Sequence, residues 1–188
     1  TVAKTNGTLL FLGGFLRPFE FNHIAVFNGS SWARLGEGIE GGIITDMAIW
    51  GERLVVCGDF IRAGGKAISK LAVWDSRDWH GIGSLTGDVL CIAILGDALF
   101  IAGGFSMVDN IEVHRIAKYQ GGSWSAVGAG LDGSIFSLLI LGQCLYAGGS
   151  FDSFAKRFCF PSEDKGFSND TSWTPVYNLS GPVHVLSA

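Results

Sequence analysis

The chain has 188 residues, of which 48% are hydrophobic, only 16% are charged and 28 are glycine. This apolar fraction excludes a disordered chain, and four prolines without a Gly-X-Y period exclude collagen. The formal charge is −4 and no basic run occurs, so the sequence argues against nucleic acid as a partner.

A repeat organises the chain. Four related segments mark it: LLFLGGF (9–15), LVVCGDF (54–60), LFIAGGF (99–105) and LYAGGSF (145–151). Their last residues are Phe15, Phe60, Phe105 and Phe151, spaced by 45, 45 and 46 residues. Two further sets keep nearly the same period: Trp32, Trp79, Trp124 and Trp173, and Gly41, Gly87, Gly133 and Gly181. We therefore predict one repeat region, 1–188, with repeats at about 1–42, 43–87, 88–133 and 134–181.

The first repeat is expected to lack its first strand. On this interpretation the chain begins in the second strand of a four-stranded motif, at 9–15, and continues with the third strand at 24–27. The turn Asn28-Gly29 leads to a fourth strand opened by Trp32. Gly in such a turn supplies the positive φ that tight turns need.

The second and third repeats each show four strands. The first strand is apolar on both faces, at Ile43–Ile49 and again at Val89–Leu95, which is typical of a strand buried on both sides. The second strand follows a Gly turn, and the third strand is LAVW at 71–74 or IAKY at 116–119. The fourth strand begins at the repeated Trp. No segment has the 3.6-residue apolar period of a helix.

The fourth repeat departs from this pattern. It starts with a first strand at Ile135–Leu141, but Phe158-Cys159-Phe160 and a polar loop, Pro161–Ser172, precede its Trp. We expect its third strand to be displaced or replaced. Residues 182–188, which include Val183–Leu186, are expected to start a further repeat or to complete the first one.

Four short strands in about 45 residues, with recurring Gly and aromatic positions, indicate a β-propeller blade. One such sheet has two apolar faces that it cannot bury alone, whereas stacked sheets cover one another. We predict an all-β propeller whose repeated Trp and Phe residues pack between blades. It is either a closed four-bladed ring or a partial array of a larger propeller, and we favour the partial array. An open array leaves apolar faces that another segment or a partner must cover.

The repeats resemble kelch-type repeats of galactose-oxidase-like propellers, and they are most similar to those of fungal cortical cell-polarity markers. The family patterns are L-[YF]-x-G-G-x-F, N-x-I-A-x-[WF]-N-G-x-x-W and L-G-x-G-[IL]-x-G. Here these patterns stand at Leu99–Phe105, Asn22–Trp32 and Leu35–Gly41. The resemblance covers most of the chain. It implies the fold, but kelch-like propellers serve as binding scaffolds, adhesive ectodomains or enzymes, so it does not give an activity.

One uncharged stretch, Gly133 to Phe151, imitates a membrane span. Gly142-Gln143 splits it and Gly148-Gly149 ends it, whereas a span needs about 20 mainly apolar residues. We expect two buried strands joined by a turn, and no membrane span in this segment. No signal peptide is visible at the start of the sequence.

The four cysteines are Cys57, Cys91, Cys144 and Cys159. They form no C-x-x-C pair, so a zinc site is not expected. Three lie in apolar strand-like runs, where a free Cys behaves as a small hydrophobic residue. Three pairings are open and the sequence does not choose among them. We favour free, buried thiols. If one disulfide forms, Cys144 and Cys159 are nearest in sequence.

Four of the six asparagines head an N-x-S/T sequon: Asn6, Asn28, Asn169 and Asn178. Chance would give roughly 0.8 such sequons. Asn-Gly-Ser is also a good turn, so Asn6 and Asn28 have a second interpretation. The excess of sequons nevertheless favours a glycoprotein that is extracellular or at the cell surface. Few cysteines agree with this, because a large β core needs few disulfides.

Catalytic motifs are weak. Copper chemistry needs converging His and Tyr, but Tyr119 and Tyr146 fall outside the innermost strands. Ser168–Trp173 only loosely resembles a sialidase turn. Glycosidases need paired carboxylates ~5–10 Å apart, and we interpret Asp88 and Asp132 as turn residues. No nucleophile-elbow motif occurs. We therefore expect that the protein is not an enzyme and that it binds no metal and no cofactor.

The loops between second and third strands, taken as 16–23, 61–70, 106–115 and 152–157, hold seven bases and four acids. We predict that they form a basic rim with ligand-binding residues Arg17, Arg62, Lys66 and Arg115. An anionic glycan or an acidic protein surface would be steered to such a rim. The alternative is that these are solvated loop charges.

We interpret the chain as a non-catalytic extracellular or cell-surface scaffold for protein or glycan binding, adhesion or assembly. It is expected to belong to a longer chain or an assembly. The alternatives are a carbohydrate-active enzyme on a propeller fold and an intracellular kelch-like adaptor.

Overall fold

The structure is a computed structural model that describes residues 2–14, 22–151, 155–160 and 172–176. The regular structure in these residues is β-strand, and no α-helix occurs in them. The all-β prediction is therefore confirmed. It follows that the described part of the chain holds no helix with the length and apolar character needed to cross a membrane. The contacts divide the chain into two compact units, Thr1–Ser84 and Leu85–Ala188.

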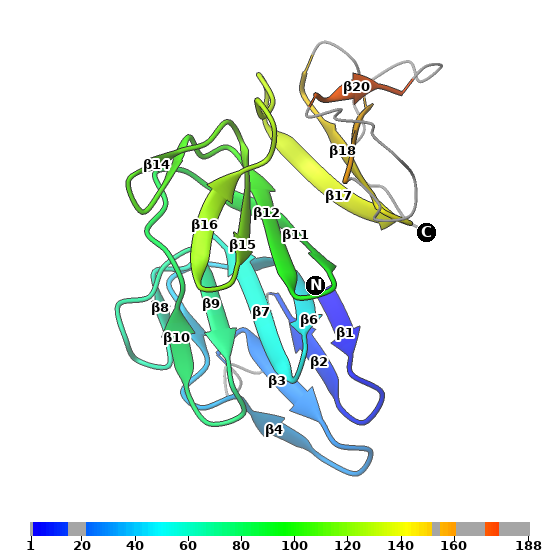
Figure 1. The fold of residues 1–188 in the computed structure, drawn as a ribbon. Coiled ribbons are helices and arrows are strands. Elements are labelled where there is room, and N and C mark those ends of the chain that lie inside the picture. The colour runs from blue at the N-terminus through cyan, green and yellow to red at the C-terminus, as the bar shows by residue number, and fades with distance from the viewer. Residues whose placement is uncertain (1, 15–21, 152–154, 161–171, 177–188) are drawn as a thin grey trace. The chain divides into compact units, whose positions relative to one another are not determined.

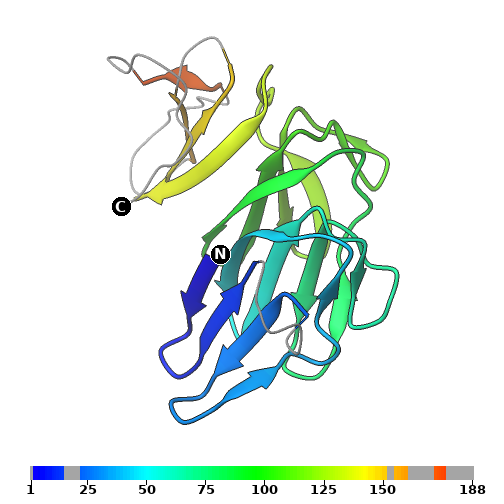
Figure 2. The same cartoon turned by 180° about the vertical axis from the view of Figure 1, so that it is seen from behind.

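The first sheet, in the first unit, is an antiparallel meander of four strands (Figures 1 and 2). They are β1 (Val2–Thr5), β2 (Leu10–Gly13), β3 (Ile24–Phe27) and β4 (Trp32–Arg34). The expectation that the chain begins in a second strand is wrong, because β1 precedes β2 and pairs with it. β1 is mostly exposed and contains Lys4 and Thr5, so it lacks the apolar run that marks the other first strands.

The second sheet completes the first unit. It consists of β6 (Ile44–Trp50), β7 (Arg53–Gly58), β9 (Leu71–Trp74) and β10 (Trp79–Gly81), hydrogen-bonded in that order. These strands agree with the predicted ones. β6 contacts β1 and β2, and the two sheets enclose a core that includes Phe11, Ile24, Phe60 and Trp79.

The register of β2 that follows from its strand pairing is shifted by one residue from the register that the repeat spacing predicts. β2 pairs Leu10 with Phe27, and β7 pairs Leu54 with Trp74. The structural equivalent of Leu54 is therefore Leu10, whereas the spacing from Phe15 to Phe60 predicts Leu9. The sequence LL at 9–10 fits either register, and the pairing with β3 decides between them.

The second unit contains two further sheets with the same order of strands. The third sheet is formed by β11 (Val89–Leu95), β12 (Ala98–Gly103), β15 (Ile116–Gln120) and β16 (Ser123–Ala126). The fourth sheet is formed by β17 (Ile135–Leu141), β18 (Cys144–Gly149), β19 (Ala155–Cys159) and β20 (Thr174–Pro175). The predicted displacement of its third strand is confirmed by β19. The apolar stretch from Gly133 to Phe151 forms β17 and β18, as expected.

In the second, third and fourth sheets, the glycine near the end of the second strand is explained by a close approach. A Cβ at Gly58, Gly103 or Gly149 would lie 2.0–2.1 Å from the carbonyl oxygen of Ile43, Asp88 or Ser134, respectively. Each of these oxygens belongs to the residue that precedes a first strand. Any side chain there would force the first and second strands apart, which explains why Gly recurs in this position.

A second set of glycines packs on the backbone that follows these positions. A Cβ at Gly87 would lie 2.8 Å from the carbonyl oxygen of Gly104, and one at Gly133 would lie 2.0 Å from that of Ser150. In the first unit the corresponding contact, to Asp59, belongs to Gly42. The marker glycine predicted at Gly41 is thus displaced by one residue, because two glycines occur together there.

Candidate functional site

The loop end of the first unit carries two of the four predicted ligand-binding residues. β5 (Ile39–Glu40) lies in the connection from β4 to β6 and pairs with β8 (Arg62–Ala63) in the loop from β7 to β9. This pairing sets Arg62 opposite Glu40, with 3.7 Å between guanidinium Nε and carboxylate Oε2. Arg62 also donates a hydrogen bond to the carbonyl of Gly65. Both charged side chains are about half exposed, so the ion pair adds at most about 1 kcal/mol.

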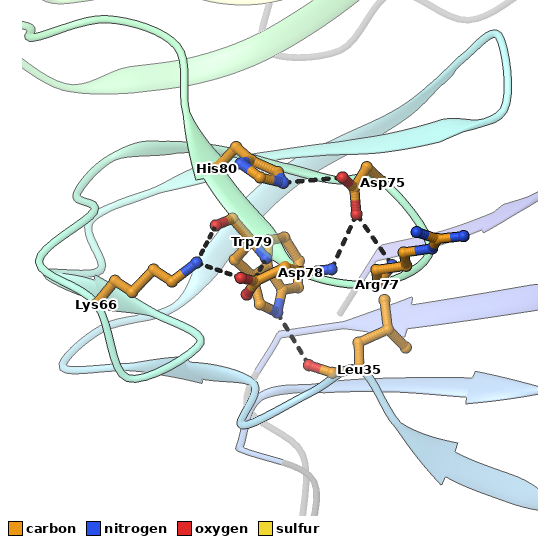
Figure 3. Close-up of polar contacts among 7 residues, drawn as sticks. All are labelled: Leu35, Lys66, Asp75, Arg77, Asp78, Trp79 and His80. Carbon is orange, nitrogen blue, oxygen red and sulfur yellow. Dashed lines mark hydrogen bonds and ion pairs between the residues drawn. The ribbon is translucent and has the colours of Figure 1, made fainter.

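Lys66 lies in the same loop and meets an acid from the hairpin between β9 and β10 (Figure 3). Its ammonium forms an ion pair with the carboxylate of Asp78 and donates to the main-chain oxygen of Trp79 at 3.2 Å. The same carboxylate accepts the main-chain N–H of Trp79 at 2.8 Å. The Lys66 hydrogen bond, followed by that N–H, lowers the pKa of Asp78. Lys66 thus connects its loop to the backbone of the buried Trp79.

Asp75 closes the same hairpin. Its Oδ1 accepts the N–H groups of Arg77 and Asp78 at 2.9 and 2.8 Å, and its Oδ2 lies 2.8 Å from Nε2 of His80 (Figure 3). The two main-chain donors are the largest causes that lower the pKa of Asp75 to about 2, and His80 adds to them. This is an Asx-type turn, in which a side chain satisfies backbone donors that the turn leaves unpaired.

Arg115 belongs to the second unit and has a conformational role. It precedes β15 with φ +69°, and its equivalents His23 and Lys70 precede β3 and β9 with φ +65° and +67°. Its N–H donates to Phe105 and its carbonyl accepts from Gly103. Its guanidinium Nη1 also donates to the carbonyl of Gly104 at 2.9 Å. The fourth predicted residue, Arg17, lies outside the described residues.

The structure therefore brings Arg62 and Lys66 together in one loop, but it provides each with an acid. The basic rim predicted from the sequence consists only of the loops between second and third strands. The β5–β8 pairing shows that the connection from the first to the second sheet, which carries Glu37 and Glu40, lies at the same end. In the second unit Lys156 likewise pairs with Asp132, at 3.7 Å between Nζ and Oδ1. An anionic ligand at this end would have to compete with these carboxylates.

A groove that the sequence does not reveal lies between the first and second sheets. It has a volume of about 220 Å³, and its apolar lining includes Leu9, Phe11, Leu54 and Trp74. Asn6, Glu52 and Arg53 contribute polar atoms. A similar groove of about 340 Å³ lies between the third and fourth sheets, with Phe100, Phe160 and Lys118 among its lining residues. Finding them requires knowing which sheet faces meet, and spacing alone does not give this.

The two described sequon asparagines lie in exposed hairpin turns of the first sheet. Oδ1 of Asn6 accepts the N–H groups of Thr8 and Leu9, at 3.1 and 2.8 Å. Oδ1 of Asn28 accepts those of Ser30 and Ser31, at 3.0 and 2.9 Å. Both therefore serve as turn residues through the side-chain oxygen. The amide nitrogen, which would carry a glycan, has no protein acceptor within the described residues. Asn169 and Asn178 lie outside them.

The cysteines divide into two pairs. Cys144 and Cys159 face one another across β18 and β19 and form a disulfide, so the expectation that all four are free thiols is wrong for this pair. The displaced β19 is what brings Cys159 opposite Cys144. Cys57 and Cys91 are free and buried, as expected. Burial, with a smaller effect of the Asp46 carboxylate, raises the pKa of the Cys57 thiol far above its usual range.

No protein-family model matches the chain, and no curated protein matches it significantly.

Proposed function

We propose that the four sheets are consecutive blades of a kelch-like β-propeller, or of part of one, and that this array is a non-catalytic scaffold. Its role would be protein or glycan binding, adhesion or assembly outside the cell or at its surface. The observation that carries the proposal is a contact found in both units. Trp79 Nε1 donates to the carbonyl of Leu35 at 2.9 Å, and Trp173 Nε1 donates to that of Val127 at 3.1 Å. Each bond joins a sheet to the one before it, as stacked blades require.

The contacts that the charged side chains make support the proposed role as a scaffold. Arg62, Lys66 and Asp75 all hold loops or hairpins in place. Such a framework presents a fixed surface, which suits recognition, and exposed ion pairs exchange readily for those of a partner. The anionic partner inferred from the sequence would therefore bind by replacing Glu40 and Asp78 as the counter-charges of this loop.

The disulfide and the sequons support an extracellular place. Disulfides persist mainly in oxidising compartments. The Cys144–Cys159 disulfide links β18 to β19 in the divergent fourth repeat. The two described sequons are exposed and leave the amide nitrogen without a protein acceptor. Glycan detected at Asn169 and Asn178 by mass spectrometry of protein from its native source would support this location, and unmodified peptides at all four sequons would contradict it.

Retention on a sulfated-glycan column tests the binding role. The triple variant R62E/K66E/R115E should elute at lower salt than the wild type. The matched control is K4E/R53E/R77E, which has the same net charge but alters exposed positions near hairpin turns. Equal retention of the two variants would show that only net charge matters. Unchanged retention of the first variant would remove the rim as a binding site.

A further inference from the structure

One face of the first sheet has the same residue pattern as the face of the second sheet that packs on the first sheet. The strand register places Leu10, Leu12, Ala25, Phe27 and Trp32 on this face, which we call the outer face. The equivalent residues of the second sheet are Leu54, Val56, Ala72, Trp74 and Trp79. That second set belongs to the core shared with the first sheet. Apart from the exposed Arg34, which lies opposite Ala25 where the second sheet has Gly81, the outer face thus has the composition of a buried interface between sheets.

In the second and fourth sheets the Trp of this face has a defined acceptor on the preceding sheet. Trp79 is fully buried, and its indole donates to the carbonyl of Leu35, three residues after Trp32. Trp173 donates to the carbonyl of Val127, three residues after Trp124. The acceptor is followed by Gly36 in the first unit, where an added Cβ would lie 3.1 Å from the Trp74 ring. A carbonyl next to a residue without a side chain therefore receives the indole.

Trp32 occupies the same position but lacks this partner. Its side chain is 42% exposed, compared with 0% for Trp79. Its ring packs on Phe27 of its own sheet, with centroids 5.0 Å apart. Within the described residues its indole nitrogen has no acceptor. An exposed Trp on a half-buried apolar face is typical of the centre of an interface.

The fourth sheet carries the complementary surface. The face opposite its Trp contains Leu139, Leu141 and Tyr146, which the register of β17 and β18 places on one side, together with Arg157 of β19, which pairs with Tyr146. Leu141 is 60% exposed. The position three residues after Trp173, equivalent to Leu35 and Val127, is Val176. Its N–H donates to Ala155 within the sheet, and its carbonyl holds the sequence position of the two indole acceptors.

We propose that the outer face of the first sheet binds the fourth sheet of a second copy of this chain, head to tail. The indole of Trp32 then donates to the Val176 carbonyl of that copy, and the contact continues the interface seen between sheets within each unit. The inference rests on the proposed stacking of sheets. Because the two surfaces differ, the contact is heterologous and either closes into a ring of copies or extends.

Sedimentation velocity over a wide range of concentration tests this. Wild type should associate, and W32A and L141D should each weaken association by about thirtyfold or more, the loss expected for an interface hot spot. The matched control is I61D. Ile61, like Leu141, is 60% exposed, but it lies in a loop outside both faces. I61D should associate as the wild type does. Circular dichroism and thermal unfolding verify that each variant is folded.

Mixing the two disabled variants fixes the geometry. W32A retains a complete fourth sheet and L141D a complete outer face, so their mixture should form heterodimers although neither associates alone. If L141D associates alone as the wild type does, the Leu141 face of the fourth sheet is not the partner of the outer face and the head-to-tail proposal is wrong. A wild type that stays monomeric at every concentration would also overturn it. Retention of that monomer on the sulfated-glycan column would leave the proposed binding function intact.

Discussion

The indole nitrogen of Trp79 donates a 2.9 Å hydrogen bond to the main-chain oxygen of Leu35, a residue 44 positions earlier. Both residues are buried. The bond therefore fixes the second sheet on the first at a point that water does not reach, and a lost donor would leave a buried carbonyl unsatisfied.

W79F should lower the free energy of unfolding by about 1–2 kcal/mol, because Phe fills most of the space but lacks the N–H. The control is W32F, at the equivalent but exposed position, which in protein dilute enough to be monomeric should change it by less than about 0.5 kcal/mol. Urea denaturation followed by circular dichroism measures both. Equal losses of unfolding free energy in the two variants would contradict the conclusion that the Trp79–Leu35 hydrogen bond stabilises the packing of the second sheet on the first.

Two neighbouring glycines of the third sheet should respond differently to alanine. At Gly103 the added Cβ would lie 2.1 Å from the carbonyl oxygen of Asp88, so G103A should destabilise the protein by about 3 kcal/mol. At Gly104 the nearest atom would be the Ser134 hydroxyl oxygen at 3.6 Å, an ordinary contact. G104A should therefore be tolerated within about 0.5 kcal/mol. Thermal unfolding of the pair tests the close approach, which fails if both melt like the wild type.

The Asp75 turn predicts a dependence of stability on acid. The folded state holds the pKa of Asp75 at about 2, below its ordinary value of 3.8. The carboxylate therefore stabilises the fold at pH values above 3.8, and this contribution is lost as the pH falls from there through 2. D75N keeps a side-chain oxygen for the turn but removes the charge.

The melting temperature of D75N should thus fall less than that of the wild type between pH 5 and pH 2.5, and be lower than it at pH 5. D75A, which also removes the acceptor, should be the least stable of the three at pH 5. Parallel melting curves for wild type and D75N across this range would show that the carboxylate charge does not stabilise the turn.

The disulfide predicts a thiol count. Without reductant, denatured protein should show two reactive thiols, from Cys57 and Cys91, and four after reduction. Native protein should react slowly, because both free thiols are buried and burial raises the pKa of Cys57. Reduction should cost about 3 kcal/mol, as expected for a loop of this length. C144A/C159A is the control, since reductant should leave its stability unchanged; four reactive thiols before reduction would contradict the pairing.

Much of the fold can be predicted from the sequence because the strands carry their own signals. Val89–Leu95 and Ile135–Leu141 are apolar on both faces and coincide with β11 and β17. β1 could not be found in this way, since its exposed Lys4 and Thr5 give no apolar run. The register of β2 cannot be predicted from the sequence either, because Leu9 and Leu10 are chemically identical and only the pairing with β3 distinguishes them.

The candidate site was predicted less well for a physical reason. Charge counting along the chain identifies Arg62 and Lys66, but not the acids that fold against them. Glu40 reaches Arg62 through the β5–β8 pairing, and Asp78 reaches Lys66 from a separate hairpin. Such pairs depend on which loops share one end of a sheet, and this is decided by tertiary structure.

The central proposal is that equivalent four-stranded sheets stack in sequence about one axis. A crystal structure of the chain tests it most directly. The account predicts that the first strands β1, β6, β11 and β17 lie innermost, in chain order around that axis, with Trp79 and Trp173 each bonded to the preceding sheet. Sheets arranged instead as two facing layers, with no common axis, would contradict it.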